Sequence, residues 1–162
     1  MEVSIGSRLP EAKLLQFGLN GPEEVSLNEL IEGEKVVIFA VPGAFTPTCS
    51  VSHVPSFVRN ASKLADRGIT KLICISVNDP FVLQAWEKNL DLKESGILLL
   101  GDAEGEFIKT IGMEFSAPAV GLVGRSKRFT MYVEDGVVKQ LNVESSPGVC
   151  EISAAETLLE QI

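Results

Sequence analysis

Three cysteines and a single histidine are the residues of this sequence with the widest scope for nucleophilic or metal chemistry. They are Cys49, Cys74, Cys150 and His53. No C-x-x-C pair occurs, and the scattered spacing suits a zinc site poorly, so we expect no bound metal. Three sparse cysteines are also not the disulfide framework of a small secreted protein. The sequence therefore favours chemistry on an individual thiol.

Cys49 stands where a buried strand is predicted to pass into a helix. Lys35–Val41 is a β-branched apolar run, and the turn Pro42–Phe45 follows it. With Thr46 as N-cap and Pro47 as first helical residue, Cys49 becomes the third, facing unpaired amides and the positive end of the helix dipole. Cysteines in such positions have pKa values of roughly 3.5–7.5 instead of about 8.5. These residues leave open that Cys49 is only a packed cysteine at a well-capped helix start.

Strands and helices are predicted to alternate around this point. Apolar runs predict further strands, and Asp135-Gly136 between the last two is a strong hairpin signal. Ser153 with Glu156 three residues later is typical of a capping box. The predicted strands are Leu72–Val77, Ile97–Leu100, Arg128–Glu134 and Val137–Val143, and the helices are Leu27–Ile31, Thr46–Arg67 with a break at Pro55, one from Pro80, Glu104–Ile111 and Ala154–Gln161.

The rest of the chain has weaker signals. The residues before Leu27 are expected to form a loose start, and Phe115–Val123, rich in Ala, Pro and Gly, a loop. The alternating order indicates parallel pairing with an antiparallel hairpin at one edge. We therefore predict an α/β protein with a thioredoxin-like fold, whose mixed central sheet carries helices on both faces, as one domain over residues 1–162.

Composition narrows the classes of function. The 162 residues are 45% hydrophobic and 22% charged, with a net charge of −8. This acidic balance argues against nucleic-acid binding. No stretch approaches the roughly 20 apolar residues of a membrane span, and the first residues resemble neither a signal nor a transit peptide. We expect a cytoplasmic protein with no membrane partner, while an organellar or processed form stays open.

The stretch around Cys49 resembles the signature of a known enzyme family. The spacing Pro42, Thr46, Cys49, within Val41–Ser50 and followed by His53-Val54-Pro55, is similar to that of the type II, or atypical two-cysteine (peroxiredoxin-5-like), peroxiredoxins. Two later blocks share this resemblance, so that it covers nearly the whole chain: Ile75–Phe81 with Trp86, and Gly124–Phe129 with Asp135-Gly136.

The resemblance implies a thiol-dependent peroxidase. Cys49 would attack the O–O bond of hydrogen peroxide or an alkyl hydroperoxide and become a sulfenic acid. Thr46 would hydrogen-bond the peroxide or the thiolate, and Pro42 would shield the thiolate, with Gly43 and Phe45 as pocket residues. No cofactor is implied.

Two arginines and the histidine are candidates to assist the thiol. The family's arginine matches Arg128, which would lie beside Cys49 and stabilise developing negative charge. Arg125 is a nearby alternative, which we expect to be a surface ion-pair partner instead. His53 lies four residues after Cys49 on the same helix face and would serve as a base, a thiolate stabiliser or, as we expect, a wall of the pocket.

The thiol that resolves the sulfenic acid is open. Cys150 follows a flexible-looking stretch and resembles the C-terminal resolving cysteine of some members, so we rank it first. Glutathione or glutaredoxin comes second, and Cys74, which matches a cysteine of plant-like members but lies in mid-strand, third. The implied reductants are thioredoxin or glutathione with glutaredoxin.

The resemblance also implies a homodimer with contacts around the active-site loops. Phe45, Phe81 and residues 115–122 are candidates, unless they pack in the monomer core. A redox sensor or chaperone-like binder using the same cysteine is the alternative function, and catalytic turnover would distinguish it from an enzyme. A disulfide reductase is disfavoured, because Ser50 and Val51, not an exchange partner, follow Cys49.

Overall fold

Nine strands are present in the computed structural model, which describes residues 1–162. They are β1 (Lys13–Gly18), β2 (Gly21–Ser26), β3 (Lys35–Ala40), β4 (Lys71–Ser76), β5 (Ile97–Gly101), β6 (Glu114–Ala117), β7 (Leu122–Ser126), β8 (Phe129–Glu134) and β9 (Val137–Val143). Seven of them form one mixed sheet in the order β2-β1-β5-β4-β3-β8-β9. β3, β4 and β5 run parallel, and the strands outside them pair antiparallel.

The central strands are the apolar runs that the sequence indicates. In β3, every residue after Lys35 is buried, as expected of a β-branched strand covered on both faces. β8 and β9 form the predicted hairpin, in which Asp135 and Gly136 have positive φ angles of 46° and 77°. Positive φ at both central residues is the geometry that Asp-Gly turns favour between antiparallel strands.

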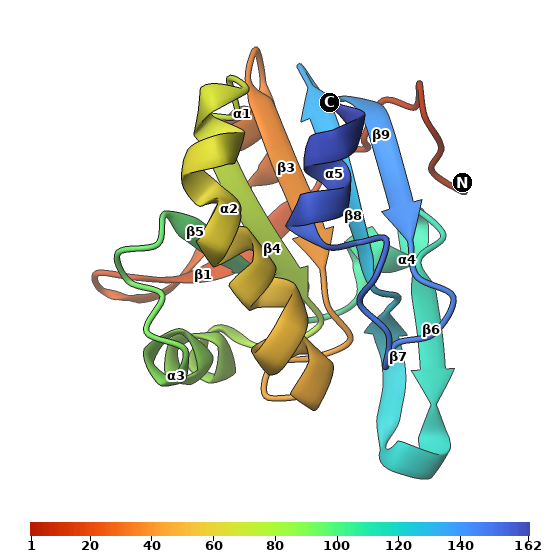
Figure 1. Cartoon of the computed structure of the whole chain (residues 1–162). Coiled ribbons are helices and arrows are strands. Elements are labelled where there is room, and N and C mark those ends of the chain that lie inside the picture. The colour runs from red at the N-terminus through yellow and green to blue at the C-terminus, as the bar shows by residue number, and fades with distance from the viewer.

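Helices cover both faces of the sheet. They are α1 (Leu27–Ile31), α2 (Val54–Asp66), α3 (Pro80–Asn89), α4 (Glu106–Thr110) and α5 (Ala155–Gln161). Apolar side chains of α2, α3 and α5 share one core with Phe39 and Cys74, and those of α1 and α4 share the opposite core with Ile38 and Ile75. Figure 1 shows α2 and α5 side by side on the same face of the sheet. The predicted thioredoxin-like fold, a mixed sheet between helices, is confirmed.

The helix that carries Cys49 begins irregularly. Pro47 and Thr48 are helical, Cys49–His53 forms a wider π-helical turn, and α2 then continues. In this turn the Val54 amide donates to the carbonyl of Cys49, five residues back. Pro55 follows at once, and a proline ring clashes with the carbonyl four residues before it, so the wider turn accommodates it. The predicted break at Pro55 therefore takes the form of a π-helical turn.

The loose start expected before Leu27 is wrong in part, because β1 and β2 form a hairpin there. β2 contains Pro22 and two exposed glutamates, Glu23 and Glu24, and none of its residues is fully buried. It lies at the edge of the sheet, where proline and charged side chains are tolerated. The hydrophobic alternation that identifies a strand is consequently absent.

The loop expected over Phe115–Val123 is also wrong. β6 and β7 pair antiparallel around the short 3₁₀ turn Pro118–Val120, and this second sheet projects beyond the end of the main one (Figure 1). Both strands have only four or five residues and pack little of their surface. Pro118 and Gly121 further interrupt the hydrophobic alternation by which a strand is recognised in the sequence.

The capping box at the last helix is wrong as well. α5 begins after Ala154, and no side chain caps it. The Ser153 hydroxyl instead donates to Glu144, while the Ala155 amide is satisfied by the Ser56 hydroxyl of α2. The hydrogen-bond partners of Ser153 thus lie in another part of the chain. None of the helices has the length and apolar character needed to cross a membrane.

Candidate active site

Cys49 lies at the carboxyl end of β3, where the chain turns into the helix. It is the third helical residue after Pro47 and Thr48, as the sequence predicts. Its side chain is fully buried in the core between the sheet and α2. A buried sulfur is unreactive in apolar surroundings, so its polar neighbours decide its chemistry.

Two donors converge on the sulfur of Cys49. The Thr46 hydroxyl lies 2.7 Å from Sγ and 2.8 Å from the carbonyl of Gly43, and Arg128 Nη2 donates to Sγ over 3.0 Å. A hydroxyl has a single proton. Thr46 can therefore donate to Gly43 when Cys49 is a thiol that donates to it, and can turn that proton to the sulfur when Cys49 is a thiolate. The arrangement stabilises the anion with a neutral and a charged donor.

Arg128 is a buried cation without a carboxylate. It is only 1% exposed, and no Asp or Glu oxygen lies within 4 Å of its guanidinium. Its other partners are neutral: Nε and Nη2 donate to the carbonyl of Pro147, over 3.2 and 3.0 Å, and Nη1 to His53 Nδ1 over 3.0 Å. A buried charge is costly unless it is paired. The Cys49 thiolate is the one anion within its reach.

His53 supports Arg128 and makes no hydrogen bond to the sulfur. Because a guanidinium only donates, His53 Nδ1 must accept, and the ring proton is assigned to Nε2. Nε2 lies 3.1 Å from the carbonyl of Ser153 and 3.2 Å from the Thr130 hydroxyl. Burial, together with the Arg128 charge, lowers the pKa of His53 to about 3. His53 is therefore neutral at physiological pH and positions the arginine.

The turn before the helix places the remaining predicted pocket residues. Pro42 and Gly43 are buried, and Arg125 Nη1 donates to the Pro42 carbonyl over 3.2 Å. A Cβ added to Gly43 would lie 2.5 Å from that same nitrogen, so the Arg125 side chain would have to shift to accommodate it. Phe45 sits on the turn with a φ of 65° and half of its surface exposed.

Arg125 is not the surface ion-pair partner that was expected. It makes no ion pair, and instead joins β7 to the turn that carries Pro42. The reason is the β6–β7 hairpin, which the sequence did not reveal and which brings residue 125 to this turn.

The two candidate resolving cysteines lie in contrasting surroundings, and both are free thiols. Cys74 is in the middle of β4, between Phe39 of β3 and Leu99 of β5, and is 2% exposed. Burial raises its pKa well above the usual value, and a negative charge on Cys49 raises it further. Cys150 is half-buried in the connection from β9 to α5, 3.8 Å from the Ser153 hydroxyl, and burial raises its pKa too.

Two contributors were missed in the sequence analysis: the Pro147 carbonyl and Glu144. The first acts through its backbone, which carries no residue signature. Glu144 Oε2 accepts from the amides of Glu151 and Ser153, contacts that a sequence pattern does not reveal.

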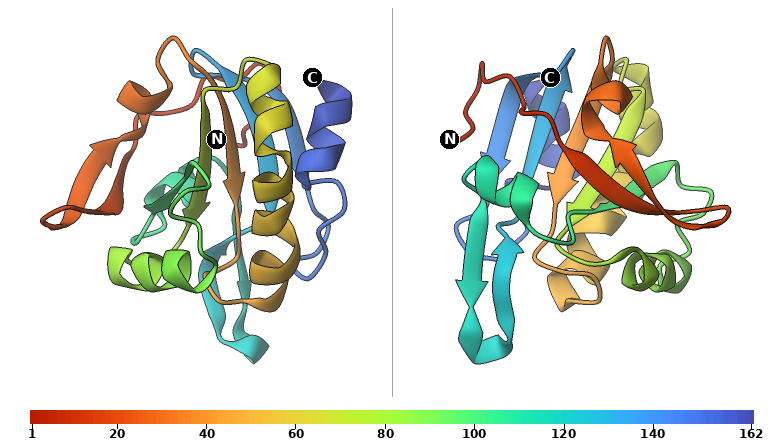
Figure 2. Two further views of the ribbon diagram at one scale, coloured as in Figure 1. Left: turned by 60° about the vertical axis from the view of Figure 1, so that its left-hand side comes forward. Right: turned by 180° about the vertical axis from the view of Figure 1, so that it is seen from behind.

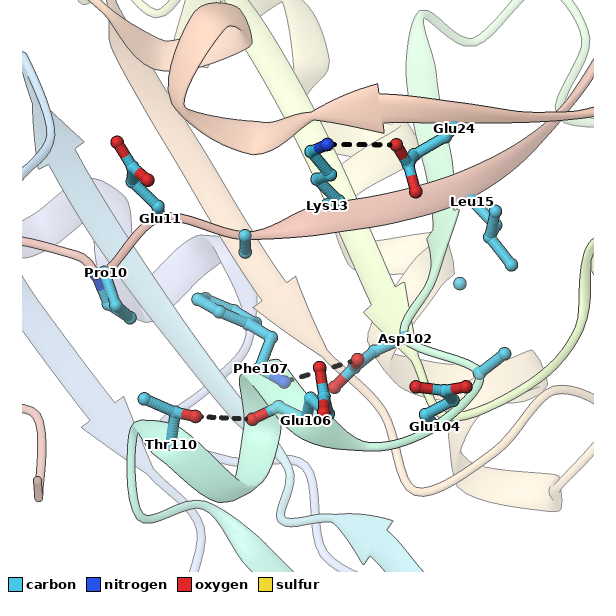
Figure 3. A pocket seen from close by; sticks show the side chains of 13 residues that line it. Pro10, Glu11, Lys13, Leu15, Glu24, Asp102, Glu104, Glu106, Phe107 and Thr110 are labelled. Carbon is cyan, nitrogen blue, oxygen red and sulfur yellow. Dashed lines mark hydrogen bonds and ion pairs between the residues drawn. The ribbon is translucent and has the colours of Figure 1, made fainter.

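A separate cavity of about 480 Å³ lies between β1 and α4 (Figure 3). Its walls are acidic, but the two best-placed carboxylates are satisfied: Asp102 accepts from the amides of Phe107 and Ile108, and Glu24 pairs with Lys13 at 3.4 Å. None of the predicted site residues lines it. No three His, Cys, Asp or Glu side chains converge anywhere in the chain as metal ligands would.

Comparisons with known proteins identify the family of this chain. The family model described as Redoxin matches residues 4–159. Peroxiredoxin-2E-2, chloroplastic, of Oryza sativa subsp. japonica is 42% identical over 99% of this chain and 72% of its own length. Peroxiredoxin-2C of Arabidopsis thaliana is 38% identical over 99% of this chain and 98% of its own.

Solved structures give the same result. Reduced Prx3 from Vibrio vulnificus in complex with H₂O₂ is 41% identical, covers 98% of this chain and 95% of its own, and superposes with a TM-score of 0.90. Peroxiredoxin 5 from Alvinella pompejana is 26% identical, with a TM-score of 0.85 over 98% of this chain and 96% of its own. The chain therefore belongs to the redoxin family and, within it, to the type II peroxiredoxins, which are thiol peroxidases.

Proposed function

We propose that this protein reduces hydrogen peroxide and alkyl hydroperoxides with the thiolate of Cys49 as nucleophile. The observation that carries the proposal is the contact of Arg128 Nη2 with Cys49 Sγ at 3.0 Å, by a buried guanidinium that no carboxylate neutralises. The complex of the related Vibrio vulnificus protein with H₂O₂ supports a peroxide as the substrate.

The reaction is a displacement on oxygen. The thiolate attacks one peroxide oxygen, so that an S–O bond forms while the O–O bond breaks. Sulfur is oxidised to a sulfenic acid, and the departing oxygen takes a proton and leaves as water or an alcohol. Arg128 is placed to stabilise the negative charge that grows on the departing oxygen, and Thr46 to hydrogen-bond the peroxide.

The pocket residues limit access to the sulfur. Pro42, held by Arg125, shields the thiolate from solvent, with Gly43 and Phe45 on the same turn. His53 acts indirectly, by keeping the guanidinium of Arg128 in place. Excluding water from such a site strengthens each electrostatic interaction within it.

The sulfenic acid must then be resolved. We propose Cys150 first, then glutathione or glutaredoxin, and Cys74 last. The contrast between the two cysteines supports this order: Cys150 lies in a connecting segment that can move without breaking the sheet, whereas Cys74 is held in β4 by both neighbouring strands. Thioredoxin, or glutathione with glutaredoxin, would return the enzyme to its reduced state.

The assembly and the location of the protein are further proposals. Phe45, Phe81, Val120 and Val123 are all at least half exposed, which favours a homodimer contact near the active-site turn and the β6–β7 hairpin. The expected cytoplasmic location stays a prediction. Relatives named chloroplastic and mitochondrial support an organellar one instead.

Steady-state turnover tests the proposed function. Peroxide consumption is measured for wild type and for Cys49→Ser, Cys74→Ser and Cys150→Ser, with thioredoxin and then with glutathione plus glutaredoxin. We expect Cys49→Ser to abolish turnover with every reductant, and Cys150→Ser to abolish turnover driven by thioredoxin. Stoichiometric consumption by wild type with every reductant would refute catalysis and favour a redox sensor.

A further inference from the structure

The segment Ser145–Ser153, here named the strap, connects β9 to α5 and carries Cys150. It crosses the active site: the Pro147 carbonyl accepts from Arg128, and the Gly148 carbonyl accepts from the Thr48 hydroxyl at 3.1 Å. Figure 1 shows it as the blue connection that descends from β9 and returns to α5. The guanidinium that donates to Cys49 Sγ thus also holds the strap, three residues before Cys150.

Glu144 joins the two ends of the strap. It is the last residue before the strap and is 8% exposed. Its Oε2 accepts from the Glu151 amide at 2.8 Å, the Ser153 amide at 2.7 Å and the Ser153 hydroxyl at 2.6 Å. No lysine, arginine or histidine neutralises it. A buried carboxylate that accepts three such bonds closes the strap with charge-assisted hydrogen bonds.

The closed strap holds Cys150 half-buried beside Ser153. Ser153, which Glu144 holds by two of those bonds, lies 3.8 Å from Cys150 Sγ. Burial raises the pKa of the Cys150 thiol, and the Ser153 hydroxyl opposes this effect in part. Cys49, to which Arg128 also donates, is fully buried. A disulfide requires the two Cα atoms to come within roughly 7 Å and an attacking thiolate. Release of the strap would expose Cys150, so that more of it ionises, and would free it to move.

We propose that Glu144 is a positioning residue that sets how often the strap opens, and thereby divides the Cys49 sulfenic acid between two fates. In the first, Cys150 attacks: an S–S bond forms, the S–O bond breaks, and the thiol proton leaves with the oxygen as water. In the second, another peroxide oxidises the sulfenic acid to sulfinic acid and is itself reduced to an alcohol or water. This inference rests on the proposed function, with Cys49 peroxidatic and Cys150 resolving.

The test compares Glu144→Gln with wild type in single-turnover kinetics. Trp86, the only tryptophan, donates to Ser50 beside Cys49, so we expect its fluorescence to respond to oxidation of Cys49 and to disulfide formation. Glu144→Gln replaces the charge-assisted hydrogen bonds by neutral ones, which are roughly half as strong. The strap should then open more often, and disulfide formation should be about tenfold faster. The sulfinic fraction, measured by mass spectrometry under excess peroxide with reductant, should fall by a similar factor. The rate constant for oxidation of Cys49 by peroxide should change less than about threefold, since Arg128 and Thr46 still contact the sulfur.

Two further variants make the result specific. Glu151→Gln removes an exposed carboxylate from the strap but keeps the amide that Glu144 holds, and should behave as wild type. Ser153→Ala removes one of the three bonds and should accelerate the disulfide step by about threefold, which gives an independent reading if Glu144→Gln folds poorly. A disulfide step in both Glu144→Gln and Ser153→Ala that is no faster than in Glu151→Gln would overturn the inference.

Failure of the Glu144 role and failure of the proposed function give different results. If Cys49 oxidises and pairs with Cys150 in wild type, but the Glu144 and Ser153 variants do so at the wild-type rate, only the role of Glu144 is lost. If wild type never forms that disulfide, the resolving role of Cys150 and this inference both fall, while the peroxidatic role of Cys49 stands. If Cys49 is not oxidised at all, the proposed function itself fails.

Discussion

Cys49 and Cys74 are equally buried on the same face of the sheet, yet their surroundings favour opposite chemistry. Two donors reach the sulfur of Cys49, one of them the charged guanidinium of Arg128. Cys74 lies between apolar strands, and burial raises its pKa well above the usual value. Burial alone therefore does not decide whether a thiol is reactive. The donors that the fold directs at the sulfur do.

Removing the charged donor should have the largest effect. We expect Arg128→Gln to lower the second-order rate constant of Cys49 with hydrogen peroxide by about 1000-fold, the upper range for loss of one preorganised donor. Stopped-flow tryptophan fluorescence measures the rate constant. Arg59→Gln, an exposed arginine on α2, is the matched control and should stay within about twofold. A rate constant in Arg128→Gln close to that of wild type would show that the reactivity of Cys49 does not depend on Arg128.

The neutral donor should contribute less. Thr46→Val keeps the shape of the side chain but removes the hydroxyl that lies 2.7 Å from the sulfur, so a loss of about 100-fold in the same rate constant is expected. Thr46→Ser restores a hydroxyl and should recover most of the activity. Failure of the serine variant to exceed the valine variant would show that the threonine serves packing and not donation.

His53, which accepts a hydrogen bond from Arg128, should make the stability of the protein depend on pH. His53 has a folded pKa of about 3, against about 6.5 in an unfolded chain. Between these values the unfolded chain binds a proton that the folded protein excludes, so the free energy of unfolding falls as the pH decreases. From pH 7 to pH 5 this loss is about 2 kcal/mol. Urea unfolding at both pH values should show a smaller loss in His53→Gln, and equal losses would contradict the assigned neutral state.

Changing Cys74 should have the smallest effect on chemistry. Cys74→Ala removes a buried sulfur, and we expect a loss of about 1 kcal/mol in the free energy of unfolding with a peroxide rate constant within about twofold of wild type. Denaturant unfolding and stopped-flow fluorescence measure the two quantities. A large drop in the rate constant without loss of stability would mean that Cys74 takes part in the reaction.

Sequence reasoning succeeded where the signals are local. Pro42, Thr46 and Cys49 lie within eight residues of one another at a strand-to-helix turn, and the helix rules place the thiol correctly. Arg128 lies 79 residues from Cys49, and only the family resemblance identified it. Its support by His53 depends on a buried contact that no spacing reveals.

The misses in the fold have a common physical cause. The β1–β2 and β6–β7 hairpins lie at the edge of the main sheet or beyond it, so they bury too little surface to impose an apolar alternation. Ser153 fits a capping motif by type and spacing, but Glu144 offers its hydroxyl a charged acceptor. Local propensity fails where a partner distant in sequence competes for the same group.

The peroxidatic role of Cys49 is tested by identifying which cysteine a single equivalent of hydrogen peroxide oxidises. Reduced protein is mixed with the peroxide, the sulfenic acid is trapped with a dimedone-type reagent, and the three cysteine peptides are quantified by mass spectrometry. We expect the trapped label on Cys49, and we expect Arg128→Gln to lose most of it on the same timescale. Label appearing first on Cys74 or Cys150, or undiminished label on Cys49 in Arg128→Gln, would contradict this expectation.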